Sequence, residues 1–303
     1  MAFFNDRSEP DIPACGGSTT TFDGNAPKVI VSREIVWLSC DCSFRTVAEP
    51  VPPYEYIAAF AAKVDDGVLA GYIARDFHRS AETLHGLGVV SDAVLADLAA
   101  IVEKYDFARS NGRCHSTSGL PENFGGSLSV DYASGESIYF SDNQSPIIRE
   151  DAGAALVDCM KRALKKDAVK GLPTAADVTG LRFEERDKEG GYHIIDWNGT
   201  ALHTEQKYRF DGDDGPVYVK DATTAPEDFD RIRALIDRNG LLYWGGLPER
   251  SGPIFEMYDK SLTFRLKDGT TRTVRDVMKG PDFTRNGIFE TEMAVNEVLR
   301  DLK

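Results

Sequence analysis

Three residues of metal-binding type stand close together in the first half of the chain. His78, Glu82 and His85 are spaced by four and three residues, so a helix would bring them onto one face. Two imidazoles and a carboxylate can bind zinc or another divalent metal. The spacing therefore allows a metal-dependent hydrolase. Gly86 and Gly88 would keep such a helix short, and a solvated polar segment is the competing interpretation.

Cysteine and histidine offer a second kind of chemistry. Cys40 and Cys42 flank one residue in a segment expected to be a strand, where alternation puts both sulfurs on one face. Zinc sites favour cysteines separated by two to four residues, so two buried thiols acting as small apolar side chains explain this pair better. Cys114 stands beside His115. A nucleophilic Cys–His pair stays open because the fold could assemble one, but structural histidines are the default interpretation.

Four residues are candidates for contact with a ligand or a protein partner. Trp197 and Trp244 stand next to glycine-containing turns, and exposed tryptophan is favoured at interfaces. For Trp244, a position that caps the core beyond its helix is the competing interpretation and the favoured one. Asn111 and Asn143 lie in loop-like segments, where amide side chains offer hydrogen bonds.

Familiar catalytic and nucleotide-binding motifs are missing from the sequence. It contains no Gly-x-Ser-x-Gly elbow, no Walker loop and no His-Glu-x-x-His. Its glycine pairs are not phosphate-binding fingerprints, because Gly86-Leu87-Gly88 lacks a third glycine and Gly245-Gly246 follows an expected helix. We therefore predict no cofactor and assign no catalytic residue.

Composition narrows the classes of partner. The net charge is −14 over 303 residues, which argues against nucleic acid and against an anionic membrane surface. No apolar run approaches the ~20 residues of a membrane-spanning helix. The five cysteines are an odd number spread along the chain, so they do not form a disulfide framework, and reduced thiols in a cytoplasm are expected.

The elements that would position these residues occur twice. When the segment 95–140 is moved by 134 residues onto 229–274, the apolar stripe and the turn glycines coincide without a gap. The order of expected strands and helices predicts an α+β fold made of two tandem repeats. Each repeat would have an antiparallel sheet with about two helices packed on it. We predict a polar N-terminal arm over 1–26, a first repeat over 27–168 and a second over 177–303.

The two repeats differ in one expected insertion. Gly67 precedes Leu95 by 28 residues, whereas Gly215 precedes Phe229 by 14. The first repeat should therefore carry about 14 extra residues in a loop near 77–90, and loops on rigid scaffolds often carry function. A decorative surface loop is the alternative. We also expect Ser91 to cap the helix that follows, and a last helix over 289–302.

A stretch of the first repeat carries a motif-like series. It runs through Asn111-Gly112, Ser118-Gly119-Leu120-Pro121 and Tyr132-Ala133-Ser134-Gly135-Glu136. In these elements the chain resembles a family of uncharacterised bacterial proteins. The resemblance covers about 35 residues of the first repeat, and it implies no activity, cofactor or catalytic residue.

Two functions fit these observations. The first is a non-catalytic binding or protein-interaction module with an unknown protein or small-molecule partner, and a toxin-neutralising protein would look the same. The second is a hydrolase, metal-dependent or not, that uses the segment 77–90.

Overall fold

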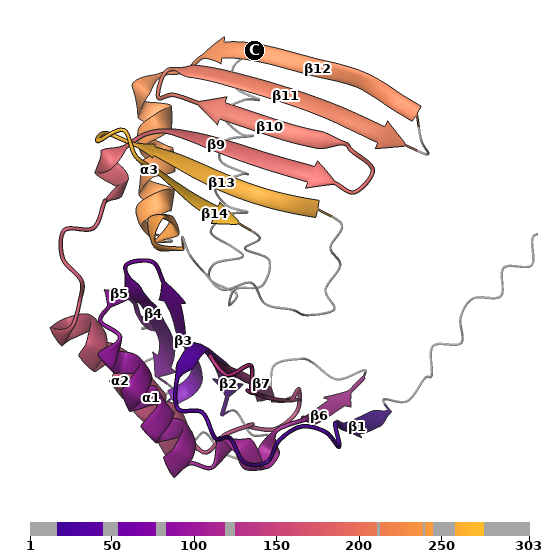
Figure 1. The fold of residues 1–303 in the computed structure, drawn as a ribbon, viewed down its shortest axis with the longest axis vertical. Coiled ribbons are helices and arrows are strands. Elements are labelled where there is room, and N and C mark those ends of the chain that lie inside the picture. Colours follow the sequence, from indigo (N-terminus) through magenta and orange to yellow (C-terminus); the bar gives the residue numbers. More distant parts are fainter. Residues whose placement is uncertain are drawn as a thin grey trace, which may run out of the picture.

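The chain forms an α+β structure with two sheets, which confirms the predicted fold class (Figure 1). The computed structural model describes residues 17–44, 54–76, 83–118, 125–210, 213–238, 240–244 and 258–275. In that part of the chain, no helix has the length and apolar character needed to cross a membrane. The predicted helix over 289–302 lies outside the described residues.

The first sheet has eight strands in the order β1-β6-β8-β7-β2-β3-β4-β5. Its strands are β1 (Ser18–Phe22), β2 (Ile35–Ser43), β3 (Tyr54–Val64), β4 (Gly67–Asp76), β5 (Thr83–Val90), β6 (Arg113–Thr117), β7 (Gly125–Tyr132) and β8 (Ser137–Asp142). Neighbouring strands are antiparallel except β6 and β8, which run parallel. The end of the predicted arm forms β1, which adds to the edge at β6.

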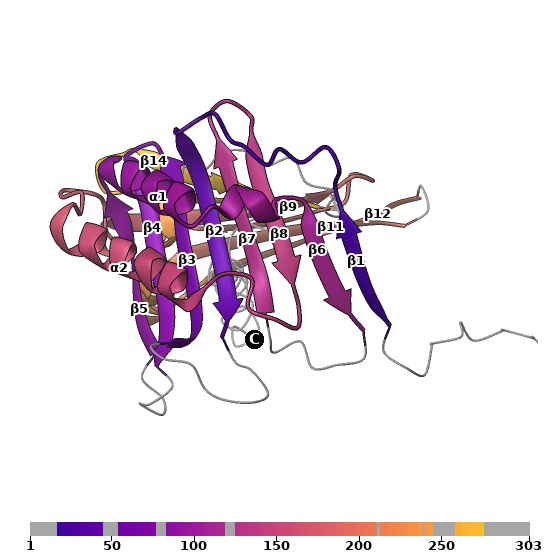
Figure 2. The same cartoon turned by 90° about the horizontal axis from the view of Figure 1, so that it is seen from below.

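Two helices cover one face of the first sheet (Figure 2). They are α1 (Ala93–Lys104) and α2 (Glu150–Lys166). The predicted stripe of α1 is buried at Leu95, Leu98 and Val102, because residues three and four apart share one face of a helix. Asp92, one residue beyond the predicted Ser91, occupies the N-cap of α1.

The second sheet has six antiparallel strands in the order β12-β11-β10-β9-β13-β14. They are β9 (Val178–Asp187), β10 (Tyr192–Trp197), β11 (Ala201–Phe210), β12 (Asp213–Thr223), β13 (Tyr258–Leu266) and β14 (Thr271–Arg275). The helix α3 (Pro226–Arg238) contributes Phe229, Ile232 and Ile236 to the buried core beside this sheet. A 3-10 helix, η3 (Leu241–Tyr243), follows it.

One apolar core joins the two halves. Trp37 and Phe60 of the first sheet belong to the same buried cluster as Leu241 of η3 and Phe264 of the second sheet. The ring of Phe60 stacks on that of Trp244, with centroids 5.4 Å apart. The apolar face of the second sheet therefore points toward the first sheet. Its other face points outward.

The predicted loop near 77–90 is wrong for residues 83–90. These residues form β5, which pairs with β4 along its whole length. The glycines of this strand, which we expected to shorten a helix, leave room for neighbouring side chains. A Cβ atom on Gly86 would lie 2.7 Å from the ring of Tyr72 and 3.0 Å from Leu164, so close packing explains glycine within a strand. Residues 77–82 lie outside the described part of the chain.

Candidate functional site

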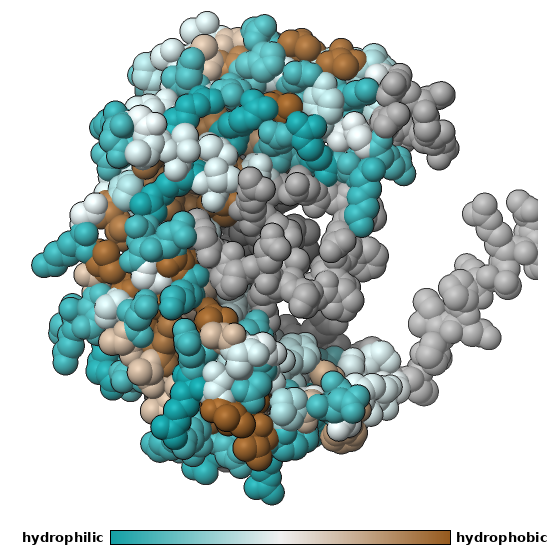
Figure 3. Space-filling view, viewed as in Figure 1, coloured by the Kyte–Doolittle hydropathy of each residue, from teal (hydrophilic) through white to brown (hydrophobic). Residues whose placement is uncertain are grey.

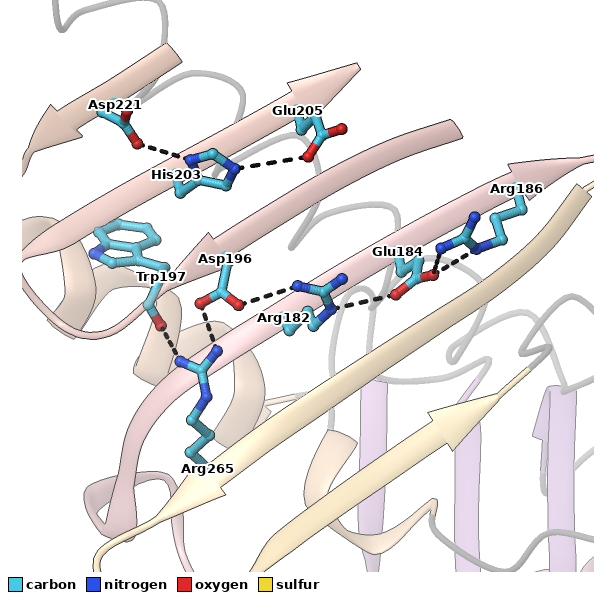
Figure 4. Close-up of polar contacts among 9 residues, drawn as sticks. All are labelled: Arg182, Glu184, Arg186, Asp196, Trp197, His203, Glu205, Asp221 and Arg265. Atoms are coloured by element: carbon cyan, nitrogen blue, oxygen red, sulfur yellow. Dashed lines mark hydrogen bonds and ion pairs between the residues drawn. The ribbon is translucent and has the colours of Figure 1, made fainter. Parts of the chain in front are cut away.

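Charged side chains line the outward side of the second sheet, which we call the outer face (Figure 4). It is formed by Arg182, Glu184 and Arg186 of β9, Asp196 of β10, His203 and Glu205 of β11, Asp221 of β12 and Arg265 of β13. Side chains alternate along a strand, so charges at every second residue gather on one side. On β9 and β10 the alternate positions Leu181, Phe183 and Ile195 are buried in the core.

A continuous chain of ion pairs crosses three neighbouring strands of the outer face. Asp196 accepts hydrogen bonds from Arg182, at 3.2 Å, and from Arg265. Arg182 also donates to Glu184 at 3.2 Å, and Arg186 donates to the same carboxylate. The register places Arg182 directly opposite Asp196, so this is a cross-strand pair of opposite charge, whereas both arginine contacts of Glu184 lie within β9. The arginines are thereby held at defined positions before any partner binds.

One carboxylate in this series of ion pairs, Glu184, has a shifted pKa. Burial alone would raise the pKa of Glu184, but the hydrogen bonds and positive charges of Arg186 and Arg182 outweigh it and lower that pKa. The side chain of Glu184 is 23% exposed and that of Arg182 is 39% exposed. The Arg182–Glu184 pair is therefore partly withdrawn from water. Charge–charge attraction is stronger at such a partly buried site than in bulk solvent.

A second polar row lies beside this chain. His203 Nδ1 is 2.7 Å from Asp221 Oδ1, and His203 Nε2 is 4.0 Å from Glu205 Oε2. Tyr192 donates its hydroxyl to Glu205, and this hydrogen bond raises the pKa of Tyr192. A histidine oriented by a carboxylate can serve as a general base. Here its second nitrogen faces Glu205 and not a hydroxyl or thiol, so the row lacks the nucleophile–base pairing of covalent hydrolases.

The outer face carries charges of both signs. Arg182, Arg186 and Arg265 stand there among the carboxylates of Glu184, Asp196, Glu205 and Asp221. Hydrophilic side chains also dominate the surface over the second sheet in Figure 3. A polyanion such as nucleic acid is bound by an uninterrupted basic surface, and this mixed pattern does not provide one.

The two candidate tryptophans lie in the core between the sheets. Trp197 is fully buried and donates its indole N–H to Thr224 Oγ1 at 3.0 Å. Trp244 is 1% exposed and stacks on Phe60. The backbone oxygen of Trp197 accepts a hydrogen bond from Arg265 of the outer face at 3.4 Å.

The two candidate asparagines bond to their own chain in the first sheet. The buried Asn111 donates to the carbonyl oxygens of Pro27 and Ser137, and accepts from the N–H of Tyr139. Asn143 accepts from the N–H of Thr117 at 2.9 Å and donates to its carbonyl oxygen at 3.0 Å. Both amides link segments of the first half to each other, whereas the outer face belongs to the second sheet.

The proposed metal ligands are only partly described. His85 is an exposed residue of β5, opposite Ile73, so its strand conformation removes the helical spacing on which the metal prediction depends. His78 and Glu82 lie outside the described residues. Within the described ranges, no group of three or more His, Cys, Asp or Glu residues is placed to hold a metal ion.

Three of the four described cysteines, Cys40, Cys42 and Cys159, are apolar core residues, and Cys114 is half-buried. Cys40 and Cys42 are buried in the core under the helices, and burial raises the pKa of Cys42 to about 11. Thiols of this kind are poor nucleophiles. His115 places its ring nitrogens 2.7 Å from the Thr20 hydroxyl and 3.3 Å from that of Thr117. Its described hydrogen bonds therefore involve threonine and not Cys114.

Comparison with known proteins gives no family. No family model and no curated protein matches the chain. Among solved structures, the DNA polymerase III β subunit of Thermotoga maritima aligns at 10% identity over 88% of this chain and 66% of its own, with a TM-score of 0.12. The DNA polymerase III β chain of Streptococcus pneumoniae aligns at 6% identity over 85% and 62%, with a TM-score of 0.13. The chain thus spans less than two thirds of the length of these proteins, and scores this low do not support a shared fold.

Proposed function

We propose that this chain is a non-catalytic protein-interaction module and that the outer face of the second sheet is its binding surface. The observation that carries the proposal is the chain of ion pairs that runs from Arg265 through Asp196 and Arg182 to Glu184. It lies on an exposed sheet face and involves several partly buried side chains.

The energetics of association favour such a surface. Binding normally costs the entropy of ordering long side chains, and arginines already held by carboxylates have lost much of that freedom. Arginine is also enriched at protein interfaces. Charges of both signs at fixed positions reward a complementary partner and repel others, so they supply specificity. The partner is therefore expected to be a folded protein with a mixed-charge surface.

Charge reversal on the outer face tests this function. Tagged wild-type protein, a variant with Arg182→Glu and Arg265→Glu, and an Arg33→Glu control would be used for affinity capture, followed by titration with the purified partner. Arg33 is an exposed arginine that pairs with Glu103 in the first half, so its reversal makes the same change of charge per substituted arginine, away from the outer face. The proposal requires binding that survives Arg33→Glu and weakens about tenfold or more with the double reversal. Equal binding by all three proteins would contradict it.

We also infer that the two halves are copies of one unit. The strand order β12-β11-β10-β9-β13-β14 of the second sheet matches β5-β4-β3-β2-β7-β8 of the first. The helix α3 follows β12 as α1 follows β5, and a 3-10 helix follows each α-helix. Independent origins would have to reproduce the same connections throughout, so a common origin is the simpler account.

Backbone details support the same inference. Gly135 and Gly269, which are 134 residues apart, share a φ of 85° in equivalent hairpin turns. In its pairing with β7, β2 leaves one residue unpaired between Ile35 and Trp37. In its pairing with β13, β9 likewise leaves one residue unpaired directly after Val178. Such bulges are retained features of a fold and not random defects.

Under this correspondence β5 is the counterpart of β12, so the segment 83–90 is not an insertion. The sequence comparison paired Gly67 with Gly215. Gly67 begins β4 after the turn from β3, whereas Gly215 lies within β12. The two glycines thus belong to hairpins that are not equivalent, and the apparent excess of residues arises from that mismatch.

A further inference from the structure

Strand β12 forms an edge of the second sheet and carries exposed apolar side chains. Val217, Tyr218 and Val219 are 48%, 58% and 58% exposed, and Tyr208 of the neighbouring β11 is 46% exposed. The rings of Tyr208 and Tyr218 pack edge to face, with centroids 6.5 Å apart. In Figure 3, apolar side chains also break the hydrophilic surface at the top, where Figure 1 draws β12. A long apolar edge strand is a ready template for pairing with another strand.

The backbone of β12 has an ordered set of outward groups. Thr224 donates its N–H to the carbonyl oxygen of Thr200. Where the register is regular, the even-numbered residues of β12 therefore direct their backbone N–H and C=O groups toward β11. Val217, Val219 and Asp221 therefore direct their N–H and C=O groups away from the sheet. Pro216, which lacks an N–H, stands at an alternate position, so it removes no donor from the outward edge.

We propose that a second copy of this chain pairs with β12, strand to strand and antiparallel, about a two-fold axis at Tyr218. This register places Val217 of each copy opposite Val219 of the other, and Tyr218 opposite Tyr218. Lys220 then stands opposite Pro216, and Asp221 opposite Gly215. All three exposed apolar residues of the strand meet apolar residues, and no like charges face each other, as a stable cross-strand pairing requires.

The self-complementarity of the strand argues for a second copy as the occupant. A register centred one residue later sets Asp221 against Val217, and one centred a residue earlier sets Val219 against Gly215. Only the register centred on Tyr218 matches every exposed apolar side chain, and a two-fold axis uses the same patch on both subunits. The two second sheets then form one continuous sheet, and their outer faces lie side by side.

Sedimentation equilibrium of the full-length chain over micromolar to submillimolar concentrations tests the dimer. Val219→Lys places a lysine in the middle of the pairing, and Val219→Pro removes an outward N–H, so both variants should weaken dimerisation by about tenfold or more. The matched control is Val29→Lys, because Val29 is an equally apolar residue that is 76% exposed in the first half. It should leave the dimer unchanged.

Crosslinking tests the register independently. In a Cys114→Ser background, Tyr218→Cys places two thiols opposite each other at a non-hydrogen-bonded pair, where Cβ atoms approach closely enough for a disulfide. Oxidation should then link two chains through position 218, as mapped by mass spectrometry. Val219→Cys in the same background should crosslink far less. A chain that stays monomeric at all concentrations would overturn the proposal. So would a dimer that tolerates both changes at Val219, or one that crosslinks better through 219 than through 218.

Discussion

At the scale of single residues, two positions adopt the same unusual backbone conformation in the two halves. Asp106 has φ 51° and ψ 47°, and Gly240 has φ 59° and ψ 29°. Each directly precedes a 3-10 helix, η1 (Phe107–Ser110) or η3. A side chain in this left-handed region costs about 1 kcal/mol relative to glycine, so one half uses the residue that the conformation favours and the other does not.

Substitutions at Asp106 and Gly240 should change the free energy of unfolding in opposite directions. Asp106→Gly should raise the free energy of unfolding by up to about 1 kcal/mol, because it removes the backbone strain. Gly240→Ala should lower it, because a Cβ atom there would also lie 2.8 Å from Leu87 Cδ2. Urea unfolding of both variants measures the two changes. Destabilisation by Asp106→Gly would show that its side chain supports the turn in another way.

Glu136 predicts a dependence of stability on pH. Its carboxylate accepts the N–H groups of Val31 and Ser32, both at 2.9 Å, and the hydroxyl of Ser134. These bonds lower the pKa of Glu136, with the backbone donors as the largest cause. A lowered pKa in the folded state contributes stability above the pKa of the unfolded chain, and this contribution is lost as the pH falls through the folded value.

Glu136→Gln should therefore lower the Tm at neutral pH, and the difference from wild type should shrink in acid. Thermal unfolding of both proteins between neutral pH and the acidic side of the ordinary glutamate pKa makes the comparison. A Tm difference that is constant over this range would mean that the substitution acts through packing and not through the charge of the carboxylate.

At the scale of elements, the charged strands of the outer face invite a double-mutant cycle. Arg182→Gln and Asp196→Asn, alone and together, isolate the coupling between the two side chains from the second contact of Asp196 with Arg265. We expect a coupling of about 0.2–1 kcal/mol that falls as salt is added, because both side chains are partly exposed. Urea unfolding at low and high salt measures it, and a coupling that salt leaves unchanged would contradict the ionic origin.

The elements that were predicted well are those with a long periodic signal. The stripe of α1 from Leu95 to Val102 and that of α3 from Phe229 to Ile236 each extend over about two turns, and both helices formed where the pattern placed them. β5 was missed because the pairing of Gly67 with Gly215 made the segment 77–90 look like an inserted loop. The space beside Gly86 and Gly88 is filled by side chains distant in sequence, which no local pattern reveals. The outer face was missed because the alternation Arg182-x-Glu184-x-Arg186 is typical of any solvated strand. Nothing local marks Asp196 as the partner that Arg182 and Arg265 meet from other strands.

At the scale of the whole molecule, the sequence of β3 indicates that this strand is covered on both of its faces. Residues 57–62 of this strand are Ile, Ala, Ala, Phe, Ala and Ala, and all of them are buried. An apolar run without alternation predicts a strand covered on both faces. One face packs under α1 and α2, and the other meets η3 and the second sheet. The sequence alone could not identify the covering partner, because Trp244 lies 184 positions after Phe60.

This shared core predicts that the two halves unfold together. Trp244 stacks on Phe60, and Arg272 of β14 pairs with Asp66 in the turn between β3 and β4. Trp244→Ala should cost about 3–5 kcal/mol, the usual range for removing a large buried aromatic side chain. Because the lost contacts lie between the halves, their unfolding should separate into two calorimetric transitions.

Leu128→Ala is the matched control for that experiment. Leu128 is fully buried in the core under α1 and α2, away from the shared cluster, so its truncation should lower the Tm without splitting the transition. Differential scanning calorimetry of wild type and both variants distinguishes the two effects. If Trp244→Ala lowers the Tm but keeps a single transition, other contacts of the shared core couple the halves. Phe60→Ala removes the ring on which Trp244 stacks. This second substitution would then show whether the remaining residues of the shared core are sufficient to couple the unfolding of the two halves.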